Sequence, residues 1–154
     1  ISENPMFDYK NLAWVGLNNP ATLDQFDLKR NHNLKMTIAQ NVRDRGIVNI
    51  MNDAMETASD GVDAVYVSID IDVLDLPLVP GCVSAEPNGM TYAELRDSLA
   101  ALAKHTKIVG FDLVEVNPQL DVGTGITSYL AAHTMMEFLG QICDQPRWVA
   151  NRNG

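Results

Sequence analysis

Two aspartates, Asp70 and Asp72, stand one residue apart at the end of an apolar segment and are the side chains best suited to chemistry. They close the run VYVSIDID at residues 65–72, which is typical of a buried β-strand. Side chains alternate across a strand, so every second residue shares a face. The predicted polar face holds Ser68, Asp70 and Asp72, and the opposite face holds Val67, Ile69 and Ile71.

Two carboxylates about 7 Å apart on a buried strand repel each other and lose hydration. Such a pair persists when a cation lies between the carboxylates or when one of them stays protonated. Carboxylate oxygens suit Mg²⁺, Ca²⁺ and Mn²⁺. Two such ions about 3.5–4 Å apart activate a water for attack on carbon or phosphorus. A strand that runs out into a solvated acidic turn is the alternative.

The bulk composition describes one ordinary globular unit. The chain has 154 residues, 46% of them hydrophobic, which is enough for a substantial core. Its net charge of −9 argues against nucleic acid or an anionic membrane as partner and is compatible with cationic ligands. Cys82 and Cys143 form no metal or disulfide pattern, so we expect a reducing compartment, the cytoplasm. No apolar run approaches the ~20 residues of a membrane span.

The order of elements predicts an α/β fold. Apolar runs predict strands at residues 12–17, 63–72 and 107–116, and helical spacing predicts helices at 37–45, 48–58 and 124–142. A further helix begins at Thr91, where Glu94 is placed for a capping box, and its spacing puts Leu95, Leu99 and Leu102 on the inner face. The helix at 124–142 has a stripe that is expected to be core: Leu130, Ala131, Met135, Phe138 and Leu139. Strands that alternate with helices imply a parallel sheet covered on both faces.

A third carboxylate, Glu115, is expected near the two aspartates. Ligands of parallel sheets lie beyond the carboxyl ends of the strands. Asp70 and Asp72 lie at one such end and Glu115 lies at another, where it could hold a cationic group by charge-assisted hydrogen bonds. A salt-bridged acid at a strand end is the structural alternative for Glu115.

These residues resemble the signature of the arginase/agmatinase family of ureohydrolases. The similarity rests on SIDIDVLD at 68–75 with the Pro-Gly, Glu-Pro and Gly residues that follow, and on GFDLVEVNP at 110–118 with Asp121. It runs in register from about residue 35 to 142. The resemblance implies a three-layer αβα fold with a mainly parallel sheet, of which this chain is the carboxyl-terminal part of one domain. It also implies two Mn²⁺ ions and hydrolysis of a guanidino group to urea and an amine.

The resemblance assigns roles position by position. Asp70 and Asp72 match metal-binding aspartates, Glu115 matches a glutamate that contacts the guanidinium, and Ser84 falls where the family lines its substrate pocket. No residue of this chain is assigned a further catalytic role. Asp75 and Asp121 are expected only to tie loops at the site.

The sequence also departs from the family pattern. Leu76 intervenes before Pro77, where the family has proline directly after the third aspartate, and the segment CVSA at 82–85 is bulkier than the family's small loop. The family takes its remaining metal ligands from a histidine and an Asp-x-His-x-Asp strand that are missing here. The three histidines, His32, His105 and His133, are expected to be structural or solvated.

The chain begins with Ile1, and we expect it to be part of a longer translation product. The N-terminal half of the domain, or a partner chain, would then complete the metal site. The expected substrate is agmatine or a small guanidino acid, and the resemblance suggests a homo-oligomer, a trimer or a hexamer.

Two alternatives remain at this point. A catalytically silent subunit or fragment would share the same fold. An apolar strand that runs into Asp-x-Asp also resembles the nucleophile loop of haloacid-dehalogenase-type phosphatases. That fold needs a further acidic pair downstream, which does not follow here, and it leaves the Pro-Gly loop unexplained.

Overall fold

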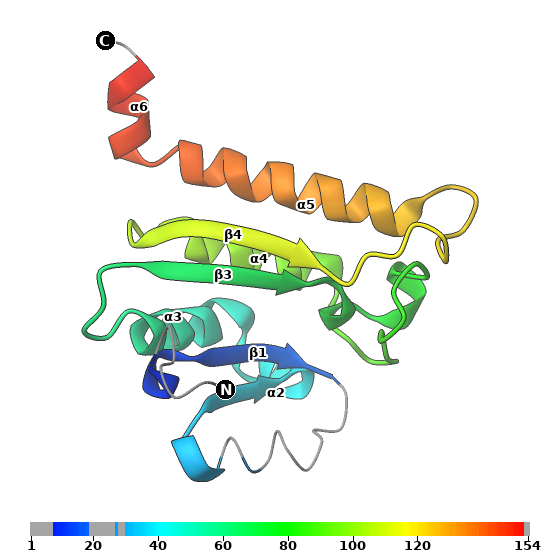
Figure 1. The fold of residues 1–154 in the computed structure, drawn as a ribbon, viewed down its shortest axis with the longest axis horizontal. Helices are drawn as coiled ribbons and strands as arrows, with labels where there is room; N and C mark the ends of the chain where they lie inside the picture. Colours follow the sequence, from blue (N-terminus) through cyan, green and yellow to red (C-terminus); the bar gives the residue numbers. More distant parts are fainter. Residues whose placement is uncertain (1–7, 19–26, 28–29, 153–154) are drawn as a thin grey trace.

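The computed structural model describes residues 8–18, 27 and 30–152, and its strands form two parallel pairs. The first pair is β1 (Ala13–Leu17) with β2 (Lys35–Ile38), and the second is β3 (Val65–Asp70) with β4 (Ile108–Val114). Each pair is a sheet of its own in the described part of the chain. All strands run in the same direction (Figure 1). The predicted parallel α/β class is confirmed.

Helices follow the strands in the order that the sequence predicts, with one addition at the end of the chain. They are α2 (Ala39–Arg45), α3 (Ile47–Ala58), α4 (Tyr92–Leu102), α5 (Ile126–Cys143) and α6 (Pro146–Arg152). Short 3₁₀ turns occupy Tyr9–Asn11 (η1), Ile71–Val73 (η2) and Leu76–Leu78 (η3). None of the described helices has the length and apolar character needed to cross a membrane.

Strand β2 corrects one prediction. The sequence favours a helix from residue 37, but Lys35–Ile38 is extended and α2 begins only at Ala39. The reason is a non-local one, since β2 pairs with β1 and places Lys35 opposite Ala13. Pairing with a distant strand outweighs the local helical preference at this point.

The start of α4 confirms the predicted capping box. The Thr91 hydroxyl accepts the N–H of Glu94 at 3.2 Å, and the Glu94 carboxylate accepts the N–H of Thr91 at 2.7 Å. Reciprocal bonds of this kind satisfy two main-chain donors that have no partner inside the helix. The inward face of α4 carries Leu95, Leu99 and Leu102, all buried, as the spacing predicts.

Helices cover one face of the second strand pair. Helix α4 lies behind β3 and β4, α3 packs against α4 and β1, and α5 runs along β4 (Figure 1). Ile69 of β3 is buried on the covered side, whereas Tyr66 is 60% exposed. Two of the three expected layers are thus present among the described residues, and the side of β3 that carries Tyr66 faces outward.

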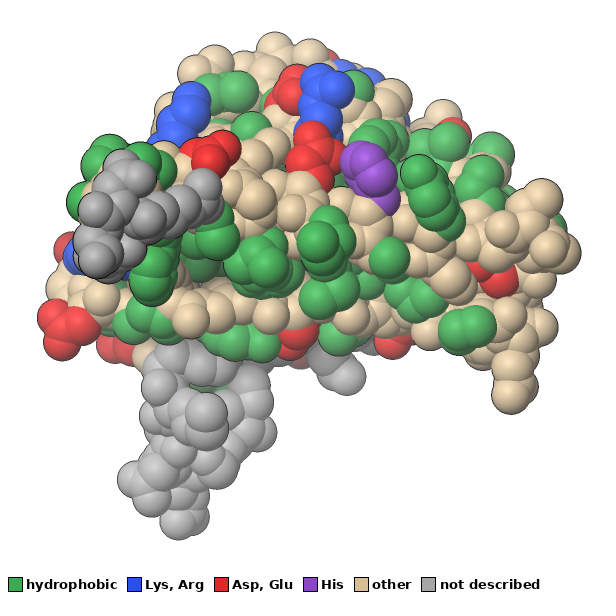
Figure 2. Space-filling model, turned by 90° about the horizontal axis from the view of Figure 1, so that it is seen from above, with side chains coloured by type: hydrophobic (Ala, Val, Ile, Leu, Met, Phe, Trp, Pro, Cys, Tyr) green, Lys and Arg blue, Asp and Glu red, His purple; other side chains and the backbone are tan. Residues whose placement is uncertain are grey.

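Helix α5 also has a buried side and an exposed side. Phe138 is fully buried and meets the ring of Phe111 edge-on at 4.9 Å. Met135 and Leu139, which the spacing also predicts as core, are 38% and 45% exposed. Figure 2 shows hydrophobic side chains over this outer surface, beside one histidine. The helix is apolar on more sides than the described neighbours cover, so the predicted core stripe is only partly correct.

Candidate metal and substrate site

Asp70 is the last residue of β3, and its side chain ends the strand. Its carboxylate accepts the main-chain N–H of Asp72 at 3.1 Å, which turns the chain into η2. Asp72 therefore lies in a 3₁₀ turn and not on the pleat. The prediction that Ser68, Asp70 and Asp72 share one strand face is wrong for Asp72, because a side-chain acceptor competes with the strand for its amide. Ile71 is fully buried and anchors the turn.

Glu115 comes directly after β4, beside the end of β3. The register places Asp70 opposite Val114, so the two strand ends bring Glu115 next to the aspartates, as the sequence predicts. The backbone of Glu115 has a φ of 67°, which non-glycine residues rarely adopt. Such conformations cluster at functional sites, because the surrounding structure must hold them. No sequence signal indicates this conformation.

The electrostatics of the three acids are unfavourable as they stand. Burial raises the pKa of Asp70 to about 6, and the charges of Asp72 and Glu115 add to the rise, whereas the hydrogen bond from the Asp72 amide opposes it. A nearby cation stabilises the ionised form of a carboxylate whose pKa is raised in this way. Asp70, Asp72 and Glu115 form what we call the acidic edge. It has the charge and the oxygen donors that a hard divalent cation needs.

The two aspartates do not make a complete metal site by themselves. Across the part of the chain that the structure describes, no group of three or more histidine, cysteine, aspartate or glutamate side chains is arranged to hold an ion. His32 stacks on Tyr9 and His133 contacts the Tyr92 hydroxyl at 2.8 Å, both consistent with the structural roles expected for them. Asp70 and Asp72 fit a divalent ion in donor type, but they fill only part of a coordination sphere.

The loop between η3 and α4 carries Ser84, the predicted pocket residue. Ser84 is half-buried, and its hydroxyl lies 3.8 Å from the sulfur of Cys82. Unlike Asp70 and Asp72, it does not line the cavity described below. Its assignment to a substrate pocket remains a prediction.

Asp75 holds this loop against the strand end, as predicted. Its carboxylate accepts the N–H of Gly89 at 3.2 Å, and its own N–H donates to the carbonyl of Met90 at 3.0 Å. A Cβ on Gly89 would lie 2.5 Å from the Asp75 nitrogen, so a side chain does not fit there. The two ends of the loop are thereby pinned together.

Asp121 ties a second loop to the start of α5. Its carboxylate accepts the main-chain N–H groups of Thr127 at 3.2 Å and Ser128 at 2.9 Å. Desolvation alone would raise the pKa of Asp121, but these hydrogen bonds outweigh it and the pKa is lowered. The Thr127 hydroxyl accepts the N–H of Gly81 at 2.8 Å, which also joins the loop at Gly81 to the start of α5. The predicted loop-tying role of Asp121 is confirmed.

The outward face of β3 and β4 holds a polar cluster that sequence reasoning missed. Asp112 accepts hydrogen bonds from the Ser68 hydroxyl at 2.7 Å and the Tyr66 hydroxyl at 3.2 Å. A charged residue inside an otherwise apolar strand was the available signal. The cluster lies on the same strand pair as the acidic edge.

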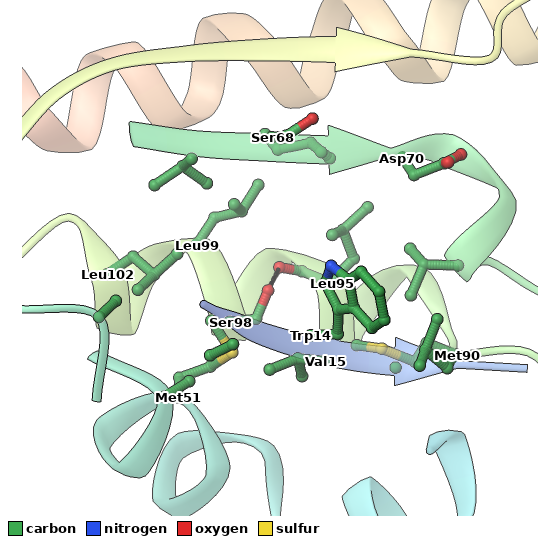
Figure 3. A pocket seen from close by; sticks show the side chains of 18 of the residues that line it. Trp14, Val15, Met51, Ser68, Asp70, Met90, Leu95, Ser98, Leu99 and Leu102 are labelled. Atoms are coloured by element: carbon green, nitrogen blue, oxygen red, sulfur yellow. Dashed lines mark hydrogen bonds between the residues drawn. The ribbon is translucent and has the colours of Figure 1, made fainter. Parts of the chain in front are cut away.

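A cavity of about 460 Å³ separates the two strand pairs. We call it the slot: it is bordered by β1 on one side and β3 on the other, and its floor comes from α3 and α4. Side chains of Trp14, Leu95 and Leu99 lie between the strands in Figure 3, with Asp70 at the end of β3. Asp70 and Asp72 both line the slot, so it opens onto the acidic edge.

Fold and strand ends together define an α/β protein with three acidic side chains, Asp70, Asp72 and Glu115, at the carboxyl ends of two parallel strands. Residues 1–140 match the model of the Arginase family, and the chain belongs to this family. It is 37% identical over 112 residues to a formimidoylglutamase of Halalkalibacterium halodurans, a match that covers 73% of this chain and 35% of the relative. It is also 46% identical over 67 residues to an agmatinase of Pyrococcus horikoshii, covering 43% of this chain and 24% of that protein.

Solved structures agree on the fold. The crystal structure of a Trypanosoma cruzi formiminoglutamase with Mn²⁺ superposes with a TM-score of 0.82 at 19% identity, covering 94% of this chain and 49% of that one. This likeness confirms the predicted arginase-like fold and its partial extent. The chain spans about a third of the length of two formimidoylglutamases that it matches over 73% and 71% of its own length.

Proposed function

We propose that the complete protein is a metal-dependent amidinohydrolase that hydrolyses a small guanidino compound, agmatine or a guanidino acid, to urea and an amine. Membership of the Arginase family supports hydrolase function at the level of the family. Residues 1–154 would form the carboxyl-terminal part of a single domain. The proposal rests chiefly on one observation, the convergence of Asp70, Asp72 and Glu115 where β3 and β4 end.

In this proposal Asp70 and Asp72 would hold two Mn²⁺ ions, together with donors from outside residues 1–154. When bound, such a pair supplies an activated water. The water oxygen adds to the guanidino carbon, the bond from that carbon to the alkyl nitrogen breaks, and the nitrogen leaves as an amine after gaining a proton. A divalent pair would also offset the desolvation that chiefly raises the pKa of Asp70 and the smaller repulsion from Asp72 and Glu115.

Glu115 has a different part, because it follows the neighbouring strand and is exposed. A guanidinium is planar and cationic, so an ionised carboxylate binds it by charge-assisted hydrogen bonds. The held backbone of Glu115 would fix the direction from which the substrate approaches. Ser84 is proposed to line the same pocket.

The relatives leave the substrate open within one chemical class. Their names include formimidoylglutamases as well as an agmatinase, and both kinds of name refer to a carbon bonded to nitrogen in an amidine-like group. A homo-oligomer, trimeric or hexameric, and a cytoplasmic location remain part of the proposal.

The experiment is an assay of the complete protein with Mn²⁺ against agmatine, arginine, small guanidino acids and N-formimidoylglutamate. Urea, or formamide for the last compound, should be released from one of them. Asp70→Asn and Asp72→Asn should each lower both bound metal and turnover, the latter by more than about 100-fold, because metal ligands matter at least as much as their supporting residues. Asp63→Asn is the matched control, since Asp63 is an exposed acid just before β3. Full activity with an emptied metal site would refute the assignment.

A catalytically silent subunit is the second candidate. It is favoured by the lack of a third metal donor beside Asp70 and Asp72 among the described residues. The two candidates differ in metal content: a silent assembly would bind no stoichiometric Mn²⁺ and release nothing from the whole panel, although the same fold is present.

A further inference from the structure

The loop that carries Ser84 is bonded to two other segments near its start. It joins η3 to α4 and lies beside the segment between β4 and α5 (Figure 1). The Gly81 carbonyl accepts the N–H of Asn117 at 2.8 Å, and Asn117 follows Glu115 by two residues. The Gly81 N–H donates to the Thr127 hydroxyl at 2.8 Å. Gly81 therefore ties the loop both to the end of β4 and to the start of α5.

Asp121 fixes the orientation of the Thr127 hydroxyl. Thr127 is fully buried, and its main-chain N–H donates to the Asp121 carboxylate at 3.2 Å. The Thr127 side chain also helps to lower the pKa of Asp121, as a hydroxyl does when it donates its proton to a carboxylate. With the proton directed there, the hydroxyl oxygen keeps its lone pairs for the N–H of Gly81. Asp121 thus acts on the loop through Thr127.

Close packing supports the same contact. A Cβ on Gly81 would lie 2.9 Å from the Cβ and the Cγ of Asp121, so the loop backbone rests directly on that side chain. The other end of the loop is held at Gly89 by the carboxylate described above. Ser84 lies between these two anchors, next to Val83, which is 71% exposed. The position of the loop tip is therefore set by its two ends.

We propose that Thr127 is a positioning residue for the substrate: its hydroxyl, held by Asp121, fixes the Ser84 loop relative to Glu115. This inference rests on the proposed function, in which Ser84 and Glu115 meet the guanidino compound, and adds a buried residue that sets how well these two groups align. The proposed metal ligands lie at the end of β3 and in η2, outside this contact. Misalignment of groups that only hold substrate raises KM and leaves kcat unchanged.

Thr127→Val in the complete protein tests this role, because valine keeps the shape of threonine and removes the hydroxyl. The assay uses Mn²⁺ and the compound of the panel that the wild type hydrolyses fastest. KM should rise by about 10-fold, with kcat within about 2-fold of the wild type and bound Mn²⁺ unchanged. A merely structural role would reduce the amount of folded enzyme, which lowers the apparent kcat and leaves KM as it was. That outcome would overturn the proposal.

Two control variants make the test specific. Thr127→Ser keeps the hydroxyl and should restore KM to within about 2-fold of the wild type. Thr134→Val makes the same change at another buried threonine of α5, about two turns further along the helix, and should leave KM unchanged. An equal rise of KM in Thr134→Val and Thr127→Val would contradict a specific contact with the loop.

Gly81→Ala approaches the same contact from the loop, and it serves if Thr127→Val does not fold. Its new methyl group would press on Asp121 and displace the loop without removing the Thr127 hydroxyl. KM should again rise by about 10-fold at unchanged bound Mn²⁺. A wild-type KM in Gly81→Ala would mean that the position of the loop does not matter to substrate, and the proposal would fail.

Amide hydrogen exchange on the metal-free, complete protein separates this inference from the proposed function. The Asn117 amide should exchange at least about 10-fold faster in Thr127→Val than in the wild type, because its acceptor lies on a loop that has lost an anchor. The Val65 amide, bonded to Lys107, should not change. Unchanged exchange at Asn117 would refute the anchoring role of Thr127. Faster exchange in a protein that hydrolyses nothing in the panel would contradict only the proposed function.

Discussion

Two regions near the strand ends differ in how their carboxylates are hydrogen-bonded. One is the corner, by which we mean the loops tied by Asp75 and Asp121, and the other is the slot between β1 and β3. In the corner, carboxylates accept main-chain N–H groups of this chain, and the pKa of Asp121 is lowered. At the slot, Asp70 has a raised pKa and the strand edges have no described partner. The difference lies in how far main-chain hydrogen bonds offset desolvation: those to Asp121 outweigh it, whereas the one bond from the Asp72 amide to Asp70 does not.

The largest expected effect concerns the tight packing of the corner. In Gly89→Ala the new methyl group would lie 2.5 Å from the Asp75 nitrogen and from the Leu74 carbonyl carbon, both of them backbone atoms. We expect the free energy of unfolding of the complete protein to fall by about 2–3 kcal/mol, as for other overpacked sites. Chemical denaturation measures this loss.

Gly123→Ala is the matched control for this change, because nothing lies within 4 Å of a Cβ at Gly123. Its unfolding free energy should stay within about 0.5 kcal/mol of the wild type. Equal stability of Gly89→Ala and Gly123→Ala would mean that the corner is not tightly packed at Gly89, and it would contradict the contrast drawn between the corner and the slot.

Glu115→Gln tests the proposed contact between Glu115 and substrate. Loss of a charge-assisted hydrogen bond should lower kcat/KM by about 10- to 100-fold, mainly through KM, because such bonds are worth about 1.5–3 kcal/mol. Bound Mn²⁺ should stay near the wild-type level, since Glu115 is proposed to contact substrate and not metal. Metal analysis and kinetics on the same samples distinguish a substrate contact from a metal ligand. A parallel loss of metal would place Glu115 among the ligands instead.

The raised pKa of Asp70 predicts a pH dependence of stability in the metal-free complete protein. The folded-state pKa is about 6 and the ordinary value is 3.8, so the folded state binds more protons than the unfolded state between these values. The contribution of Asp70 to stability therefore falls as pH rises through this window and stays low above it. Asp70→Asn should melt higher than the wild type at about pH 7.5 and lose this advantage toward about pH 4.

Melting curves across this pH range, with and without Mn²⁺, measure the effect. Added Mn²⁺ should stabilise the wild type and not Asp70→Asn, because ion binding favours the folded state only where the ligand is present. Identical pH profiles for the two metal-free proteins would contradict this prediction, because they would show that the ionised carboxylate of Asp70 does not destabilise the fold.

The capping box and the shared edge of the parallel strand ends could be predicted from the sequence, whereas the partner of β2 and the turn at Asp72 could not. The Thr91–Glu94 capping box and the approach of Glu115 to Asp70 follow from short-range spacing and from the rule for parallel strand ends. The position of Asp72 was wrong because the carboxylate of Asp70 competes for its amide, a choice that alternation alone does not reveal. Strand β2 was missed because its partner, β1, is remote in the sequence.

The slot also lay beyond sequence reasoning, for a related physical reason. Apolar runs indicate that strands exist, but their order in the sheet depends on contacts between segments that are far apart. The exposed Met135 and Leu139 show the same limit, since helical spacing predicts an apolar side but not which neighbour covers it. Predictions thus failed where they depended on which segment lies beside which, or on a side chain that competes for a main-chain amide.

The smallest expected effect is at the start of α4, which connects the two regions: Met90 before it is bonded to Asp75, and Leu95 within it lines the slot. Thr91→Ala removes a hydroxyl that accepts the Glu94 amide and should cost about 1 kcal/mol in chemical denaturation. Thr91→Ser keeps the hydroxyl and should recover most of that loss. Because the cap is local, the exchange rates of the Tyr66 and Ser68 amides in β3, which borders the slot, should not change in native conditions. A selective rise in those rates would instead mean that α4 is held in place from the corner, and that the two regions are one cooperative unit.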